Sequence, residues 1–194
     1  MKLHCLIQLM ISAIILLGLI FNIRNSRLFN FYDHLLHHKL VRNRDSKIWK
    51  IITILNEPKV IVVWDFLLAG LLVLLNHPWL AVWSLGTLAV TDAVGIFLKH
   101  SVKRQRPLSM KTYRDGYSFP SGHVLSATIM SLMLWQIFGH TMGIWLLIIL
   151  ITAWGLVVIS RLNMRAHYPS DVLGATSLAL FCFTIAQQLL GLAF

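Results

Sequence analysis

Residues 142–160 read MGIWLLIILITAWGLVVIS, nineteen consecutive positions without a charged side chain. A helix of about 20 apolar residues is long enough to cross the hydrocarbon core of a bilayer. The whole chain has 194 residues, of which 57% are hydrophobic and only 12% are charged. This composition is too apolar for an ordinary soluble domain and indicates a membrane protein.

Apolar runs of similar length lie on both sides of this stretch. The full set covers about 5–23, 60–76, 79–98, 122–140, 142–160 and 172–192. We therefore predict an all-α fold, a polytopic membrane helical bundle of six transmembrane helices that forms one domain over residues 1–194. The first run is interpreted as a retained anchor, because it lacks the small-residue cleavage site of a secretory signal.

Residues 27–56, between the first two spans, mix apolar and basic side chains. Leu28, Phe31 and Trp49 occur among cations such as Arg42 and Arg44. This mixture suits a helix or a helix pair that lies at the membrane interface. A solvated basic connector that touches lipid headgroups is at least as good an interpretation of the same residues as a substrate gate.

The remaining polarity is concentrated on one side of the predicted bundle. The links between spans 2 and 3 and between spans 4 and 5 are short turns, whereas the other three connections hold nearly every charge. These connections are residues 24–59, 99–121 and 161–171. With six spans they share one membrane face, which then carries 16 of the 17 Lys and Arg residues. The positive-inside tendency alone would make this face cytoplasmic.

The first polar cluster on this face is KHSVKRQRP, residues 99–107, at the end of the third span. Lys99 supplies an ammonium group, and Arg106 supplies a guanidinium that can grip phosphate oxygens through paired hydrogen bonds. Taken alone, such a loop is more typical of contact with anionic lipid than of a catalytic site.

The second cluster is PSGH, residues 120–123, where the fourth span begins. The first turn of a helix has free amide groups and a positive dipole, so it favours an anion. Gly122 lets a phosphate approach the backbone, while Ser121 can either donate a hydroxyl or cap the helix. His123 is placed where it could give a proton to a leaving oxygen. A plain helix cap with an interfacial histidine is the competing interpretation.

The third cluster is SRLNMRAHYPSD, residues 160–171, between the last two spans. His167 and Asp171 are four residues apart, a spacing that places two side chains on one helix face. An aspartate near an imidazole can fix its tautomer and leave the other ring nitrogen free to attack. Arg161 adds a further cation. A charged turn with an incidental ion pair would also account for these residues.

The three clusters together offer two histidines, a carboxylate, several cations and a helix N-terminus on one face. This set fits phosphoryl transfer through a phosphohistidine, in which cations hold the phosphate oxygens, one histidine attacks and the other protonates the leaving group. A metal site is the other common use of histidine. His34, His37 and His38 have helical spacing, but no acidic cluster accompanies them, so we do not predict a metal site.

The same three segments resemble the signature of the type 2 phosphatidic acid phosphatase family. Lys99 to Pro107 matches a lysine, six residues and Arg-Pro; residues 120–123 match PSGH; Ser160 to Asp171 matches Ser-Arg, five residues, His, three residues and Asp. The family includes membrane lipid phosphate phosphatases and soluble vanadium haloperoxidases. With the span pattern, the resemblance covers most of the chain from about residue 60.

The resemblance implies a role for each motif residue. His167 would be the nucleophile, Asp171 would orient it and His123 would be the general acid. The phosphate would be bound by Lys99, Arg106, Ser121, Gly122 and Arg161. The resemblance also implies hydrolysis without a metal or other cofactor. Arg165 departs from the small and aromatic residues that are typical before the nucleophile, which bears on the preferred leaving group.

We therefore expect a multi-pass protein of the cell membrane that hydrolyses a lipid phosphate or diphosphate and has no nucleic-acid partner. Undecaprenyl diphosphate, phosphatidylglycerol phosphate and phosphatidic acid all fit, and the oligomeric state is not predicted. Bacterial members of the family usually hold the site on the extracytoplasmic face, so we expect that orientation although the charge count favours the reverse. The alternative function is a transporter or headgroup-binding protein that releases no phosphate.

Overall fold

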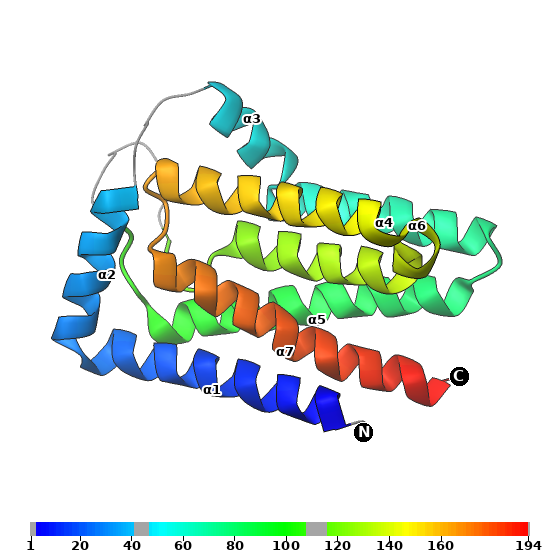
Figure 1. Cartoon of the computed structure of the whole chain (residues 1–194), viewed down its shortest axis with the longest axis horizontal. Coiled ribbons are helices and arrows are strands. Elements are labelled where there is room, and N and C mark those ends of the chain that lie inside the picture. The colour runs from blue at the N-terminus through cyan, green and yellow to red at the C-terminus, as the bar shows by residue number, and fades with distance from the viewer. Residues whose placement is uncertain (1–2, 41–46, 108–115, 194) are drawn as a thin grey trace.

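The computed structural model describes residues 3–40, 47–107 and 116–193, and all regular structure within these ranges is α-helical. Seven helices follow one another along this part of the chain (Figure 1). They are α1 (Leu3–Asn25), α2 (Arg27–Leu40), α3 (Lys47–Leu55), α4 (Pro58–Leu74), α5 (Pro78–Val102), α6 (Gly122–Asn163) and α7 (Pro169–Ala193). The prediction of an all-α bundle is confirmed.

Four of these helices, α1, α5, α6 and α7, are long and apolar enough to cross a membrane. The protein is therefore a multi-pass membrane protein. Helix α4 corresponds to the predicted span 60–76 and has a similarly apolar sequence, but it is only 17 residues long. The predicted count of six spans thus exceeds the four that length and composition establish.

Helix α6 covers two of the predicted spans, because its 42 residues are interrupted at Gly143. The backbone there has φ 58° and ψ −143°, a conformation outside the helical region that glycine reaches without a Cβ clash. Figure 1 shows the two halves of α6 running in opposite directions beside each other. The turn that we predicted at residues 140–142 therefore lies at Gly143.

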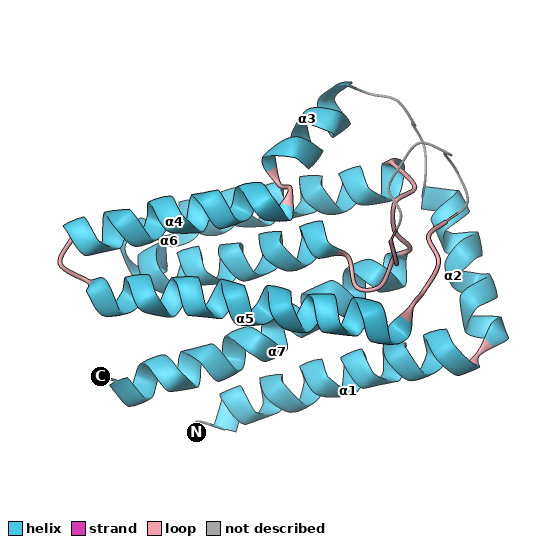
Figure 2. Cartoon of the chain, turned by 180° about the vertical axis from the view of Figure 1, so that it is seen from behind, coloured by secondary structure: helices cyan, strands magenta, loops and turns pink. Residues whose placement is uncertain are grey.

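The polar connections gather at one end of the bundle. Figures 1 and 2 show the α5–α6 and α6–α7 connections at the end that α2 crosses, while the described ends of the chain and the α4–α5 turn lie at the other end. This arrangement brings the three sequence clusters near one another. It also shows that α2 belongs to the polar end of the molecule.

The predicted interfacial segment 27–56 is divided into α2 and α3, and Arg42 and Arg44 lie outside the described residues. In α2 the two buried side chains are polar, since Asp33 and His37 are 7% and 2% exposed. Apolar side chains such as Phe31 point outward instead. The helix thus presents its polar side to the bundle, and membrane association of its outer face stays a prediction.

Close packing on α7 fixes the loop that leads into α6. The ring of Phe119 is fully buried and occupies the space that a Cβ on Gly174 would need. Ala175 and Ala179 continue the same buried face of α7, and small residues let neighbouring helices and loops approach closely. The PSGH segment therefore begins from a firmly held position.

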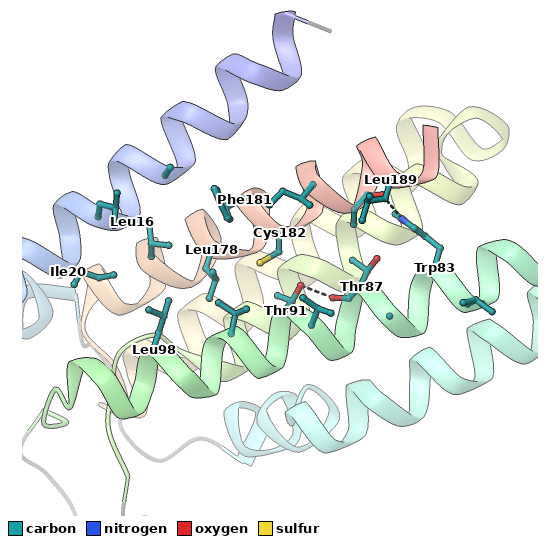
Figure 3. A pocket seen from close by; sticks show the side chains of 18 residues that line it. Leu16, Ile20, Trp83, Thr87, Thr91, Leu98, Leu178, Phe181, Cys182 and Leu189 are labelled. Carbon is teal, nitrogen blue, oxygen red and sulfur yellow. Dashed lines mark hydrogen bonds between the residues drawn. The ribbon is translucent and has the colours of Figure 1, made fainter. Parts of the chain in front are cut away.

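An apolar groove of about 620 Å³ lies between α1, α5 and α7 (Figure 3). It extends along α5 from Leu98 to Trp83, and its floor on α7 includes Leu178 and Leu189. The 18 described residues that line it include no charged side chain. It cannot supply the cations that phosphate binding requires, so the candidate active site must be sought at the polar end.

Candidate active site

The first group of site residues follows the end of α5. Lys99 lies in the last turn, and the helix ends at Lys103, whose φ of 53° turns the chain out of the helix. A small cavity of about 130 Å³ adjoins Lys99 and is also lined by Asp92, Gly122 and Ser126. Asp92 accepts a hydrogen bond from Ser126 Oγ at 3.0 Å. Lys99 thus borders a pocket that α5 and the start of α6 form together.

The second group stands at the N-terminus of α6. Ser121 is the N-cap residue, yet its side chain makes no capping hydrogen bond. Both Ser121 Oγ and His123 Nε2 are buried and have no hydrogen-bond partner among the described residues. A Cβ on Gly122 would lie 3.8 Å from Lys99 Nζ, which shows that the helix terminus and the ammonium group are close together. The Ser121 side chain therefore does not act as a plain cap of the helix.

Arg161 enters the site from the last turn of α6. Its side chain is 2% exposed, and Nη2 donates to Thr53 Oγ1 of α3 and to Met164 Sδ. A cation in the last turn also interacts favourably with the helix dipole. Helix α3 thus helps to hold this guanidinium, a contact that the sequence did not predict.

His167 lies in the turn between α6 and α7 and is 2% exposed. Its Nδ1 donates to the backbone carbonyl of Ser118 at 2.8 Å, whereas Asp171 Oδ2 lies 3.7 Å from the same nitrogen. The shorter contact is the hydrogen bond, since 3.7 Å exceeds normal hydrogen-bond length. Because Nδ1 carries the proton, the available lone pair of the ring is on Nε2. This nitrogen lies 3.5 Å from Arg106 Nη1.

The surroundings of His167 keep its imidazole neutral. Burial lowers its pKa to about 4, and the cations Arg106 and Lys99 act in the same direction, while Asp171 opposes them. At neutral pH the ring is therefore uncharged, and Nε2 can act as a nucleophile.

Asp171 is fully buried in the first turn of α7 and has strong partners other than His167. Its Oδ1 accepts from Arg104 Nη1 at 2.8 Å, and its Oδ2 accepts from the Tyr168 N–H at 2.8 Å. Its backbone carbonyl accepts from the Ser121 N–H at 3.2 Å. Asp171 therefore ties the start of α6 to the start of α7, beside its predicted contact with His167.

The backbone interlocks the connecting segments. The Ser118 N–H donates to the Arg104 carbonyl at 2.8 Å, and Arg106 Nη1 donates to the Ala166 carbonyl at 3.1 Å. The Ala166 N–H in turn donates to the carbonyl of Arg161 at 3.2 Å. The α5–α6 segment and the α6–α7 turn thus hold each other in place.

The structure brings the sequence-predicted residues into one cluster. Lys99, Arg106, Arg161 and His167 all interact electrostatically with His123. Ser121 and Gly122 precede His123 directly, and Asp171 contacts His167 as described above. Four further groups contact these residues and were not predicted from the sequence: Asp33, Thr53, Arg104 and the Ser118 carbonyl.

The histidines of α2 lie close to one another, with 4.6 Å between the ring centroids of His34 and His38. Within the described ranges, however, no group of three His, Cys, Asp or Glu side chains is arranged to hold a metal ion.

The fold and the site together define a helical membrane protein with a cluster of cations and histidines at one end of its bundle. The chain belongs to the PAP2 superfamily, whose family model matches residues 80–192. This match confirms the resemblance that the three sequence motifs indicate.

Individual relatives are similar over shorter stretches. Over 69 residues the chain is 42% identical to phosphatidylglycerophosphatase B of Haemophilus influenzae. This aligned stretch covers 33% of this chain and 29% of that protein. Over 98 residues it is 35% identical to decaprenylphosphoryl-5-phosphoribose phosphatase of Mycobacterium tuberculosis. This aligned stretch covers 45% of this chain and 51% of that protein. The match thus spans about half or less of either relative's length.

A solved structure agrees over nearly the whole chain. It is a transmembrane phosphatidylglycerolphosphate phosphatase of PAP2 type from Bacillus subtilis, with a TM-score of 0.85 and 21% sequence identity. The superposition covers 96% of this chain and 98% of that one, which shows that the two share a fold.

Proposed function

We propose that this protein is an integral membrane phosphatase that removes the terminal phosphate from a lipid phosphate or diphosphate. One observation supports this proposal above the others. Ser121 Oγ and His123 Nε2 are buried and have no hydrogen-bond partner among the described residues, at a helix N-terminus near Lys99, Arg106 and Arg161. Buried polar atoms normally have partners, and a phosphate at this helix terminus would supply them.

The first proposed step forms a phosphohistidine. The lone pair of His167 Nε2 attacks phosphorus, and the bond between phosphorus and the leaving oxygen breaks. His123 gives its proton to that oxygen, so the lipid leaves as an alcohol or as a lipid monophosphate. The cations and the first-turn amides of α6 stabilise the charge that spreads over the three equatorial oxygens.

The second proposed step regenerates the enzyme. Water attacks the phosphohistidine, His123 accepts a proton from this water, and the bond between phosphorus and Nε2 breaks to release inorganic phosphate. Nδ1 keeps its hydrogen bond to the Ser118 carbonyl throughout, so the same tautomer returns. Asp171 stabilises the positive charge that the ring acquires during both steps.

The substrate class is tested by phosphate release from purified protein in detergent or vesicles, without added metal. The panel contains phosphatidic acid, phosphatidylglycerol phosphate and undecaprenyl diphosphate, with water-soluble glycerol phosphate as the matched control. We expect release from at least one lipid and at least about tenfold less from glycerol phosphate. Binding or transfer of these lipids with no phosphate released would favour the non-hydrolytic alternative and contradict the proposal.

We also propose that the chain forms one membrane domain with six spans and an active site on the extracytoplasmic face of the cell membrane. The reversal of α6 at Gly143 supports two spans within that helix, and 17-residue α4 would supply the sixth. Reporters fused after Asn76 and at the C-terminus should both be cytoplasmic, whereas one inserted at Arg165 should be outside. A C-terminal reporter found outside the cell would overturn this orientation.

A further inference from the structure

We propose that Asp33 of α2 is a positioning residue of this phosphatase site, acting on Asp171 and His167 through Arg104 and the first turn of α7. The inference rests on the proposed phosphohistidine mechanism. Asp33 lies outside all three sequence motifs and outside the residues 80–192 that the family model matches.

Asp33 is anchored to the start of α7 by both of its carboxylate oxygens. Oδ1 accepts from the Ser170 N–H at 3.2 Å, and Oδ2 accepts from Ser170 Oγ. A carboxylate is favourable at a helix N-terminus, where amide groups lack intrahelical partners. A residue 137 positions away therefore caps the helix that carries Asp171.

Arg104 connects Asp33 to Asp171 through the two ends of one guanidinium group. Nη2 donates to Asp33 Oδ2 at 2.7 Å, and Nη1 donates to Asp171 Oδ1 at 2.8 Å. The planar group also lies 4.1 Å from the centroid of the Tyr168 ring, which fixes its plane. The side chains of Arg104 and Asp33 are 8% and 6% exposed, and that of Asp171 is fully buried, so solvent weakens these contacts little.

This geometry determines which atoms of Asp171 face the nucleophile. Arg104 holds Oδ1, and the remaining oxygen, Oδ2, lies 3.7 Å from His167 Nδ1. If Asp33 lost its charge, Arg104 would keep Asp171 as its one anionic partner among the described residues and would draw that carboxylate away from His167. The first turn of α7 would also lose its carboxylate cap, two residues after the nucleophile.

The test compares three variants of the full-length protein: Asp33→Asn, Arg104→Gln and the double variant. We expect Asp33→Asn to lower kcat between about tenfold and hundredfold with KM changed less than about twofold, because small displacements of reacting groups slow chemistry. Because the two residues act as one unit, the double variant should lose no more than about twofold beyond the worse single variant.

Asp65→Asn is the matched control, since Asp65 is also a buried carboxylate but lies in α4, which supplies no residue to the chain of contacts between Asp33, Arg104 and Asp171. We expect its kcat within about twofold of the unmodified protein. Thermal unfolding and size-exclusion profiles establish that each variant is folded. If Asp33→Asn does not fold, Ser170→Ala carries the test, because it removes the hydroxyl that both Asp33 and Arg104 contact. Its kcat should fall about three- to tenfold.

Unchanged kcat in folded Asp33→Asn, or in Ser170→Ala where that variant replaces it, would overturn the inference. Losses that multiply in the double variant would overturn it too, because Asp33 would then act independently of Arg104. His167→Ala separates this failure from failure of the mechanism. If His167→Ala is inactive and Asp33→Asn is unaffected, only the proposed role of Asp33 is contradicted. If His167→Ala is active, the proposed mechanism itself is contradicted.

Discussion

Replacing His167 with alanine is expected to lower kcat for phosphate release from a lipid phosphate by about 10⁴-fold or more, because the covalent route loses its nucleophile. The imidazole is buried, its Nδ1 is held by the Ser118 carbonyl and its Nε2 lies near Arg106. No other described histidine in this cluster combines a ring nitrogen whose proton is held by a backbone carbonyl with an unprotonated nitrogen. Phosphate release from a single-turnover reaction measures the loss.

Trapping the intermediate separates loss of the nucleophile from general damage. The protein is mixed with a substrate whose phosphate is labelled, and the reaction is quenched in alkali. The unmodified chain should retain the label and His167→Ala should not, because phosphohistidine is stable to base and labile to acid. His140→Ala is a suitable control, since His140 is exposed next to the Gly143 turn. Retained turnover or retained label in His167→Ala would contradict the assignment.

The pH profile is a second readout of the same assignment. Because burial and the neighbouring cations lower the pKa of His167 to about 4, its nucleophilic form is present above that pH and is lost as the pH falls through it. The acid limb of kcat/KM should therefore lie near pH 4. Ionisation of the substrate phosphate, near pH 6, gives a separate break that all variants share. Loss of activity centred near pH 6.5 and attributable to the enzyme would contradict a buried neutral nucleophile.

The motif residues could be proposed from the sequence because their chemistry depends on local spacing. Lys99 and Arg106 flank the exit from one helix, Ser121 to His123 open the next, and His167 and Asp171 are one helical turn apart. Apolar periodicity then predicts the helices, and counting them places the connections at one end. Both steps depend on residues near one another along the chain.

Contacts between distant segments were not predictable in this way. Arg104 was visible as one of several cations between Lys99 and Pro107, but nothing in its spacing indicated that it joins Asp33 to Asp171. The Ser118 carbonyl is a backbone group and carries no residue signal at all. Asp33 fell within the segment 27–56 that was predicted to lie at the membrane interface, because local composition does not show which side of α2 faces the bundle.

The prediction of the number of spans was limited by the apolar turn within α6. Gly143 reverses the chain without a polar linker, so hydropathy alone gives an almost unbroken apolar stretch through α6. Only the positive φ of this glycine distinguishes one long helix from two antiparallel ones. The sequence prediction placed a short turn between the spans 122–140 and 142–160, just before the actual turn at Gly143.

Replacing His123 with alanine is expected to lower kcat on a lipid phosphate by about 10²- to 10³-fold, within the range for loss of a general acid. His123 Nε2 is buried at the start of α6 and has no hydrogen-bond partner among the described residues, and Arg161, Lys99 and Arg106 lie near enough to interact with it electrostatically. A lipid alkoxide is a poor leaving group unless it is protonated. The loss should therefore fall mainly on kcat for substrates of this kind.

The leaving group provides the discriminating comparison for His123. p-Nitrophenyl phosphate releases a stabilised phenolate that needs no proton, so His123→Ala should lose at least about tenfold less activity on it than on the lipid. Ser131→Ala is the control on the same helix, because the Ser131 hydroxyl donates to the carbonyl of Ala127 within α6. Equal losses on the two substrates would place His123 among the groups that bind phosphate. Proton transfer to the leaving oxygen would then have to come from water.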